Sequence, residues 1–463
     1  MFRCLGSFLL LSVLEANAAR AQTVTIIANL TNATGTSPDY AALVQGIDGN
    51  FYGTAQDNGP LGSGGSVFKV TPEGTVMAIT GFETQNSSTP AGGLLEDQEG
   101  NFFGTLSQSG STAKMEGAVF KITPSGTLTY LLTFNNNNGA DPQCTLVRAI
   151  DQNLYGTATL GDPVDDGLGG ANGDGVVFRL GGTPSFQILH VFSGSATDGS
   201  QPAAGLLQAS DGNFYGTTQY GGANNDGTVF RITAEGVFTL LHSFDGSDGN
   251  TPTGALLQAD GGELYGTTSG VEHGGGSIFK ITLTGEFTLL YHFPSHSKGD
   301  PFSGLIQATD GNFYGTTTYG GEFGGGTIFS MTPGGTITTI YNFDRFDADQ
   351  PVAALLQATD GNLYGTTYLG GPAGGVVFQV ATGLSPFVLT IPALGAASTE
   401  VTILGNDLTG TTEVSFNGTP AAFTVESPTY IRAIVPVGAS RGKVTVTTPS
   451  GTLSSNKNFL VLP

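Results

Sequence analysis

The chain has 463 residues, with 15 Lys and Arg against 37 Asp and Glu, and its formal net charge is −22. Hydrophobic residues make up 38% of the sequence, more than a disordered chain would have, and the acidic balance argues against nucleic acid, whose phosphates require a basic surface. The 73 glycines follow no three-residue period, which excludes a collagen-like chain.

The first 21 residues predict a secretory signal peptide. Arg3 supplies a positive start, Leu5 to Leu14 form a short apolar run, and Ala19-Arg20-Ala21 is a small-residue cleavage site. The alternative is a buried N-terminal strand or helix. After cleavage near Ala21, no later apolar run is long enough to span a bilayer, so we expect a secreted protein with no membrane span and no visible anchor.

Tandem repetition dominates residues 22–382. A segment exemplified by Asp211-Gly212-Asn213-Phe214-Tyr215-Gly216-Thr217 recurs with small changes, and a phenylalanine follows it after a glycine-rich stretch. A regular period of this kind is typical of repeat architectures. The Gly-Thr pair of the repeat begins at Gly53, Gly104, Gly156, Gly216, Gly266, Gly315 and Gly365.

Each repeat predicts four short antiparallel strands, which we letter A to D. In the fourth copy they cover residues 205–209, 213–218, 228–233 and 237–244. Asp211-Gly212 favours a two-residue hairpin turn between strands A and B, because both positions tolerate positive φ. Four strands in about 50 residues are typical of one blade of a β-propeller, so the repeats predict an all-β, seven-bladed β-propeller.

The N-terminal strand is expected to close this ring. No strand D follows the last strand C at Val376–Val380, whereas Val24 to Leu30 has the apolar pattern of strand D and precedes the first strand A. Pairing of these two segments would complete the last blade and remove an exposed sheet edge. An open solenoid or two separate sheets is the alternative.

The repeat motifs resemble a known family. The Leu-Tyr-Gly-Thr-Thr motif and the Gly-Gly-x-x-x-x-Gly-Thr-Val-Phe motif are similar to the GloVer tandem repeat of secreted bacterial proteins, over roughly residues 40–380. That family is defined by its repeats rather than by a reaction. The resemblance therefore implies a propeller fold and an extracellular location.

Residues 384–463 predict a separate, small β-sandwich. Short alternating strands, such as 400–403 and 443–446, are separated by turn signals. Val401–Gly405, Val414–Ala421 and Val435-Pro436-x-Gly438 are similar to the IPT/TIG immunoglobulin-like domain. This resemblance implies a spacer or an interaction module.

The D–A and B–C loops share one end of a propeller blade, and here they are long, variable and acidic. Variable loops on a rigid scaffold usually carry binding residues, and an acidic surface disfavours anionic partners. The alternatives are a solvated acidic rim and aromatic rings that pack between blades. The candidate binding residues on this face are Tyr220, Tyr319, Tyr368, Phe323, Asp245, Asp248, Glu272 and Glu322.

The sequence requires no cofactor, and calcium is the one candidate. Asp165, Asp166, Asn172 and Asp174 lie in the long B–C loop of the third copy. Calcium takes six to eight oxygen ligands from carboxylates and carbonyls, which these residues could supply in part. Their spacing does not match an EF-hand loop.

Strand A carries a polar residue at one equivalent position, where glutamine predominates. Glu96 and Arg148 are the two exceptions and fall in consecutive repeats, so we expect a structural ion pair between them. The seven residues are Gln45, Glu96, Arg148, Gln208, Gln258, Gln307 and Gln357.

Catalytic signals are weak. His190, His242 and His292 lie on or beside strand D, where we expect solvated side chains, and the chain has no H-E-x-x-H motif, cysteine pair or P-loop. The sequence therefore favours a secreted, non-enzymatic protein that binds an extracellular glycan or protein through its loop face. One alternative is an extracellular polysaccharide lyase or hydrolase with its site in the propeller funnel, and another is a structural surface protein that self-associates.

Overall fold

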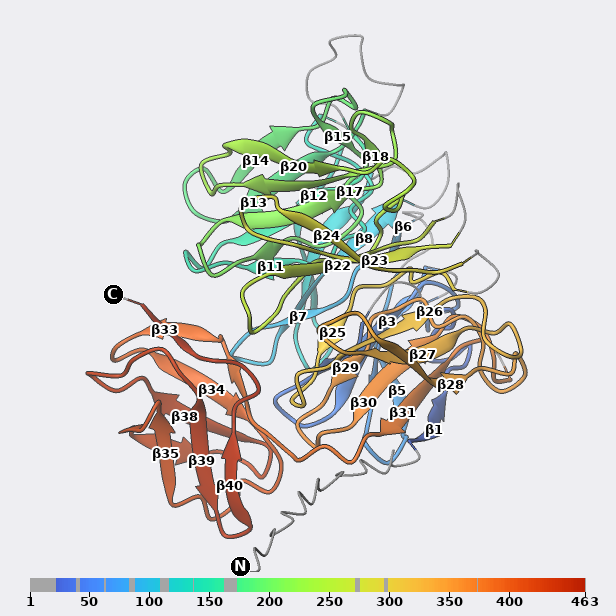
Figure 1. Ribbon diagram of the computed structural model, residues 1–463. Coiled ribbons are helices and arrows are strands. Elements are labelled where there is room, and N and C mark those ends of the chain that lie inside the picture. The colour runs from blue at the N-terminus through green and yellow to red at the C-terminus, as the bar shows by residue number, and fades with distance from the viewer. Residues whose placement is uncertain are drawn as a thin grey trace, which may run out of the picture.

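The computed structural model describes residues 22–38, 42–61, 64–82, 88–108, 116–135, 137–161, 173–270, 275–294, 299–372 and 374–462 (Figure 1). Every regular element in these ranges is a β-strand. Over the same ranges, no helix is long and apolar enough to cross a membrane. The all-β prediction is therefore confirmed for the part of the chain that the structure describes.

Antiparallel sheets follow one another along the repeat region, and we number them in chain order. Sheet 1 contains β2 (Val44–Gln45), β3 (Phe51–Ala55), β4 (Ser66–Val70) and β5 (Val76–Gly81). Sheet 2 contains β7 (Leu95–Glu96), β8 (Phe102–Gln108), β9 (Ala118–Ile122) and β10 (Leu128–Thr133), and β6 (Ser88–Pro90) also pairs with β8. Sheet 3 contains β11 (Val147–Arg148), β12 (Leu154–Ala158), β13 (Val176–Leu180) and β14 (Phe186–Val191).

The later sheets have the same order of strands. Sheet 4 contains β16 (Leu207–Gln208), β17 (Phe214–Thr218), β19 (Thr228–Ile232) and β20 (Phe238–Ser243). Sheet 5 contains β21 (Leu257–Gln258), β22 (Leu264–Thr268), β23 (Ser277–Ile281) and β24 (Phe287–His292). Sheet 6 contains β25 (Ile306–Gln307), β26 (Phe313–Thr317), β27 (Thr327–Met331) and β28 (Ile337–Asn342). In each of these sheets the four strands correspond to the predicted strands A to D.

The N-terminal strand completes sheet 7. This sheet has the order β1 (Thr23–Asn29), β31 (Val376–Ala381), β30 (Leu363–Thr367) and β29 (Leu356–Gln357). The antiparallel register pairs Ile26 with Phe378. The expected pairing between the first strand and the last strand C is therefore confirmed.

Hydrophobic clusters join each sheet to the next. Tyr155 of sheet 3 stacks on Phe214 of sheet 4, with 4.1 Å between ring centroids. The rings of Tyr364 of sheet 7 and Phe51 of sheet 1 are tilted against each other with 4.2 Å between centroids, inside a cluster that contains residues of both sheets. Because the last sheet shares a core with the first, the series of packed sheets is closed.

Packing explains the repeated Asp-Gly-Asn-x-Tyr-Gly-Thr motif. The Asp211 carboxylate accepts hydrogen bonds from the Asn213 backbone N–H and the Tyr215 hydroxyl, at 3.1 and 2.8 Å, and so fixes the A–B turn. A Cβ on Gly216 would lie 2.6 Å from the ring of Phe230, so only glycine leaves room for that phenylalanine. These contacts give the motif a structural role in each repeat.

The C-terminal region is a two-sheet β-sandwich. One sheet contains β32 (Leu389–Ile391), β34 (Glu400–Leu404), β38 (Tyr430–Ile434) and β37 (Phe423–Val425). The other contains β36 (Thr419–Pro420), β35 (Glu413–Phe416), β39 (Val444–Thr448) and β40 (Gly451–Ser454). A separate parallel pair is formed by β33 (Leu394–Ala396) and β41 (Leu460–Leu462). Residues of both sheets, among them Ile403 and Phe416, form one buried core.

This sandwich contacts the repeat region at its A–B turns, which we call the turn end. The Thr429 hydroxyl donates to the Ile47 carbonyl in the turn of sheet 1, at 2.8 Å. The backbone N–H of Phe387 donates to the Thr359 carbonyl in the turn of sheet 7, at 3.0 Å. Figure 1 shows the sandwich, in red and orange, beside the sheets of the repeat region. The D–A and B–C loops therefore lie at the end that it leaves open.

Candidate functional site

The loops that follow strands D and B meet at one end of the repeat region, which we call the loop end. Before sheet 4, β15 (Gly199–Ser200) in the D–A loop pairs with β18 (Tyr220–Gly221) in the B–C loop. A bridge between Asp349 and Leu369 joins the corresponding loops at sheet 7. Figure 1 shows β15 and β18 at the top, away from the C-terminal sandwich.

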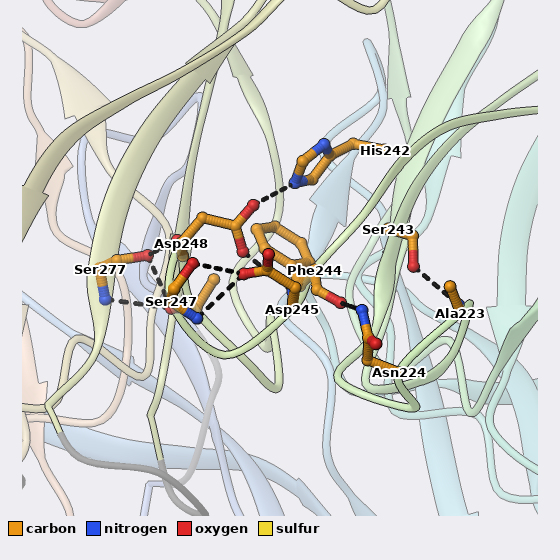
Figure 2. Close-up of polar contacts among 10 residues, drawn as sticks. Ala223, Asn224, His242, Ser243, Phe244, Asp245, Ser247, Asp248 and Ser277 are labelled. Carbon is orange, nitrogen blue, oxygen red and sulfur yellow. Dashed lines mark hydrogen bonds and ion pairs between the residues drawn. The ribbon is translucent and has the colours of Figure 1, made fainter.

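Asp245 and Asp248, two predicted binding residues, lie on the D–A loop between sheets 4 and 5 (Figure 2). Asp245 is exposed, and its Oδ1 accepts hydrogen bonds from the backbone N–H and the hydroxyl of Ser247, at 3.0 and 2.6 Å. These bonds hold the pKa of the Asp245 carboxyl below its ordinary value. Asp245 therefore presents a permanent negative charge to solvent at neutral pH.

Asp248 has a structural contact instead. Its Oδ2 lies 2.8 Å from Nε2 of His242, and its backbone carbonyl accepts from the Ser277 hydroxyl of sheet 5 at 2.9 Å (Figure 2). The His242 ring stacks on Phe287, with 3.9 Å between centroids and 6° between planes. The half-buried Asp248 thus fastens its loop to both neighbouring sheets.

The expectation of solvated histidines is wrong for His190 and His242. Both side chains are largely covered, because the first aromatic residue of strand D in the next sheet covers the imidazole ring. Nε2 of His190 lies 3.1 Å from Asp198, and its ring stacks on Phe238. Burial alone would raise the pKa of Asp198, but the bond and charge of His190 lower it overall. His292 is exposed, as predicted.

The candidate tyrosines on the loop end are half-buried. Tyr220 and Tyr319 occupy equivalent positions, and the carbonyl of each accepts a threonine hydroxyl, from Thr218 and Thr317, at 2.8 Å. The backbone N–H of Tyr368 donates to the Gln350 carbonyl at 2.9 Å. The main chain is therefore fixed at each position and each residue is partly covered, so stacking on a ligand stays a prediction.

Two phenylalanines are far more exposed. Phe323, a predicted binding residue, is 53% exposed in the B–C loop of sheet 6. Phe346, which the sequence interpretation missed, is 85% exposed in the following D–A loop. The Arg345 guanidinium donates to the Gly324 carbonyl at 2.7 Å and so ties the two loops together. We call Phe323 and Phe346 the aromatic pair.

Acidic residues lie next to both members of the aromatic pair in the chain. Glu322 precedes Phe323 and is exposed, and its backbone N–H donates to the Asn342 side chain at 2.9 Å. Asp344 accepts from the backbone N–H groups of Phe346 and Asp347, at 2.9 and 3.1 Å, and so shapes the loop that exposes Phe346. Glu272, the remaining predicted acid, lies outside the described residues.

The predicted calcium ligands fall largely outside the described ranges. Asp165, Asp166 and Asn172 lie outside them, whereas Asp174 lies within. Oδ1 of Asp174 accepts from the Ser200 hydroxyl at 2.6 Å, and its backbone carbonyl accepts from the Gln201 N–H at 2.8 Å. Asp174 therefore links the B–C loop of sheet 3 to the following D–A loop, and its binding of calcium stays a prediction.

Glu96 and Arg148 do not form the predicted ion pair. Glu96 accepts from the Ile47 backbone N–H of sheet 1 at 2.9 Å, whereas Arg148 lies over the Phe103 ring of sheet 2 at 5.0 Å. Among the ion pairs of the described residues, none joins the two side chains. The reason is geometric: side chains at this position point the same way around the series of sheets, so each meets the sheet before its own.

Two family models match this sequence. The model described as Gloeobacter/Verrucomicrobia repeat matches residues 14–168 and again residues 168–378. The model of the IPT/TIG domain matches residues 383–461. Among curated proteins, nothing matches.

Solved structures with a similar fold include enzymes. A streptogramin B lyase structure has a TM-score of 0.53 at 15% identity, covering 78% of this chain and 97% of that one. A fungal alcohol oxidase in complex with copper has a TM-score of 0.48 at 10% identity, covering 95% and 99%. A putative 6-phosphogluconolactonase from Bacteroides fragilis has 0.43 at 17%, covering 65% and 83%. At 15% identity, the likeness to the streptogramin B lyase concerns the fold alone.

Proposed function

The chain belongs to the Gloeobacter/Verrucomicrobia repeat family and ends in an IPT/TIG domain, and we propose that it is a secreted binding protein whose seven-bladed β-propeller presents its loop end to an extracellular glycan. The aromatic pair carries this proposal. Phe346 exposes 85% of its surface. Contact between an apolar ring and water is unfavourable, so covering the ring would lower the free energy. A sugar ring with its apolar face on Phe346 would bury that surface.

The charge on the loop end narrows the class of glycan. Asp245 and Glu322 are exposed there, and the whole chain carries −22. Such a surface repels uronic acids and sulfated sugars and favours neutral or amino sugars. Half-buried Tyr319 and Tyr368, on the B–C loops of sheets 6 and 7, would extend the contact beside the aromatic pair.

The position of the IPT/TIG domain agrees with this role. It contacts the turn end through Thr429 and Phe387 and leaves the loop end open. In this proposal it acts as a spacer or as a second contact on the turn end and does not cover the binding face.

A binding experiment tests the proposal. The chain from Gln22 to Pro463 is applied to an array of neutral, amino and acidic glycans, with calcium and with chelator. We expect binding to neutral or amino sugars, and a loss of about tenfold in affinity for Phe346→Ala, equivalent to about 1.4 kcal/mol. Val237→Ala, which removes a 63% exposed apolar side chain in the C–D turn of sheet 4, is the matched control.

Two outcomes would overturn this function. Unchanged affinity after combined replacement of Phe323 and Phe346 would show that the aromatic pair does not contact the sugar. Binding to no glycan, together with capture of an extracellular protein that depends on the same pair, would replace the glycan by a protein partner.

One observation favours the alternative, an extracellular polysaccharide lyase or hydrolase. Asp300, at the loop end before sheet 6, is only 1% exposed, and burial raises the pKa of its carboxyl to about 7. A carboxyl group that titrates near neutral pH has the pKa of a general acid or base, and this one would have to be uncovered to contact a substrate. Turnover of a polysaccharide that is lost in Asp300→Asn, with the fold retained, would favour the enzyme over the binding protein.

A further inference from the structure

A cavity of about 410 Å³ lies where the innermost strands of several sheets converge. Its walls come from strands A and the residues just before them, and small side chains such as Ala203 and Ala255 make room for it. Neighbouring strands approach closely around it, since a Cβ on Gly205 would lie 2.7 Å from the Thr145 carbonyl oxygen. The volume falls within the range of small-molecule sites in proteins.

The lining of the cavity differs from the rest of this acidic protein. No Asp, Glu, Lys, Arg or His occurs among the described residues that form its walls. Leucines at equivalent positions just before strand A, among them Leu206 and Leu256, and the ring of Phe302 provide apolar surface. The cavity therefore offers neither a counter-ion for an anion nor a carboxylate for a cation.

Two glutamine amides supply polar groups at the wall. The Gln143 side-chain N–H donates to the Asp141 carboxylate at 2.9 Å, which orients the amide and leaves its carbonyl oxygen as an acceptor. Gln219 lies in the B–C loop of sheet 4, and its backbone N–H donates to the Gln201 carbonyl at 3.1 Å. Gln219 is among the residues that form the wall, so its side-chain amide adds a donor and an acceptor there.

We propose that this cavity binds a small, uncharged, largely apolar molecule that carries an amide or hydroxyl group for Gln143 and Gln219. An anion would be repelled by the acidic loops and would find no cation inside. A charged or heavily hydroxylated ligand would lose more hydration than these few polar groups can replace. The site is distinct from the aromatic pair and does not depend on glycan binding there.

The ligand enters from the loop end. At the opposite end, the side chains of Gln45, Gln258 and the equivalent glutamines accept hydrogen bonds from the A–B turn of the preceding sheet. These bonds hold neighbouring sheets together at the turn end. Beyond them, the IPT/TIG domain contacts the turns through Thr429. Gln219, by contrast, lies at the loop end, so the polar groups of the cavity face the open side.

Four probes of similar size test the chemistry of the site. Benzamide, benzoate, benzylamine and glucose are titrated against the chain from Gln22 to Pro463, and binding is followed by ligand-observed NMR. We expect benzamide to bind. The affinities of benzoate, benzylamine and glucose should each be at least about tenfold weaker. Equal binding of benzoate or glucose, or no binding of benzamide, would overturn the proposal.

Two variants locate the binding. Ala255→Phe places a large ring in the cavity and should abolish benzamide binding. Ala397→Phe, at an exposed alanine of the C-terminal domain, is the matched control. Gln219→Ala removes the side-chain amide and should weaken the affinity for benzamide by about fivefold, which is typical of one lost hydrogen bond. Because Gln219→Ala keeps the packing, it remains informative if Ala255→Phe fails to fold.

The outcomes separate this site from the loop-end function. Phe346→Ala should leave benzamide affinity unchanged, and Ala255→Phe should leave glycan binding unchanged. Unaltered benzamide binding in both Ala255→Phe and Gln219→Ala would place the probe elsewhere and refute the cavity as its site.

Discussion

The side-chain carbonyl of Gln208 accepts a hydrogen bond from the backbone N–H of Ile150, in the A–B turn of the preceding sheet, at 2.9 Å. This contact is repeated around the series of sheets. Arg148, which has no acceptor, interrupts it between sheets 2 and 3. The other acceptor–donor pairs are Gln45 with Thr359, Glu96 with Ile47, Gln258 with Ser210, Gln307 with Asp260, and Gln357 with Thr309.

Replacing Glu96 by glutamine should stabilise the protein at neutral and alkaline pH. Burial raises the pKa of Glu96 to about 8, and Asp48 and Asp97 add to the rise, although the Ile47 N–H opposes it. The folded protein therefore binds more protons than the unfolded chain between pH 4.5 and about 8, and the free energy of unfolding falls as pH rises through that window. An uncharged amide in place of the Glu96 carboxyl removes this loss.

Urea unfolding at several pH values checks this. We expect Glu96→Gln to raise the free energy of unfolding by about 1 kcal/mol or more at pH 8 to 9, and by much less below pH 5. Gln208→Glu makes the reverse change at the equivalent position of sheet 4. It should lower the free energy of unfolding above pH 7, because it introduces a half-buried carboxylate. A gain that does not change with pH would contradict the buried-carboxylate explanation.

The hydrogen bond between Thr429 and Ile47 should help to hold the C-terminal domain on the turn end. Thr429→Val keeps a side chain of similar shape beside Gly49 and removes the hydroxyl, at a cost of about 1 kcal/mol of docking free energy. Limited proteolysis of the connecting segment 383–387 measures the effect, and cleavage should be faster. Thr424→Val, at an exposed threonine of β37, should leave the rate unchanged, and equal rates in both variants would rule out this contact as a support.

The half-buried His242 should stabilise the loop at residues 244–250. His242→Phe keeps a ring over Phe287 but loses the bond to Asp248, and we expect a cost of about 1 kcal/mol; His242→Ala loses both contacts and should cost about 2 kcal/mol. Thermal unfolding measures these changes. His292→Ala, at the exposed histidine of the next sheet, is the control and should have no effect.

Calcium, if it binds the B–C loop of sheet 3, should raise the melting temperature through mass action. The measurement compares the protein with calcium and with chelator, and then the double variant Asp165→Asn and Asp166→Asn. We expect the variant to lose the calcium effect while Asp174, bonded to Ser200, keeps its structural contact. Identical melting temperatures with calcium and chelator would remove calcium as a cofactor.

Local signals in the sequence were sufficient for the architecture. The turn at Asp211-Gly212, the glycine that makes room for Phe230 and the alternation of each strand act over a few residues, so every repeat predicts its own sheet. Even the pairing of β1 with β31 could be predicted, because a strand lacking at one end of the repeats is present at the other.

The site depended on contacts that the sequence does not record. Whether His242 is covered and which way Glu96 points are decided by residues of a neighbouring sheet, about 50 positions away in the chain. The exposure of Phe346 depends on how its own loop folds and on the bond from Arg345 to the B–C loop of sheet 6. The cavity likewise exists only where strands from several sheets converge on small side chains such as Ala255. The sequence by itself determined the strands and their order, since these follow from short-range turns and periodicity. The tertiary structure alone decided which side chains are exposed, paired or gathered around a cavity, because that depends on packing between sheets.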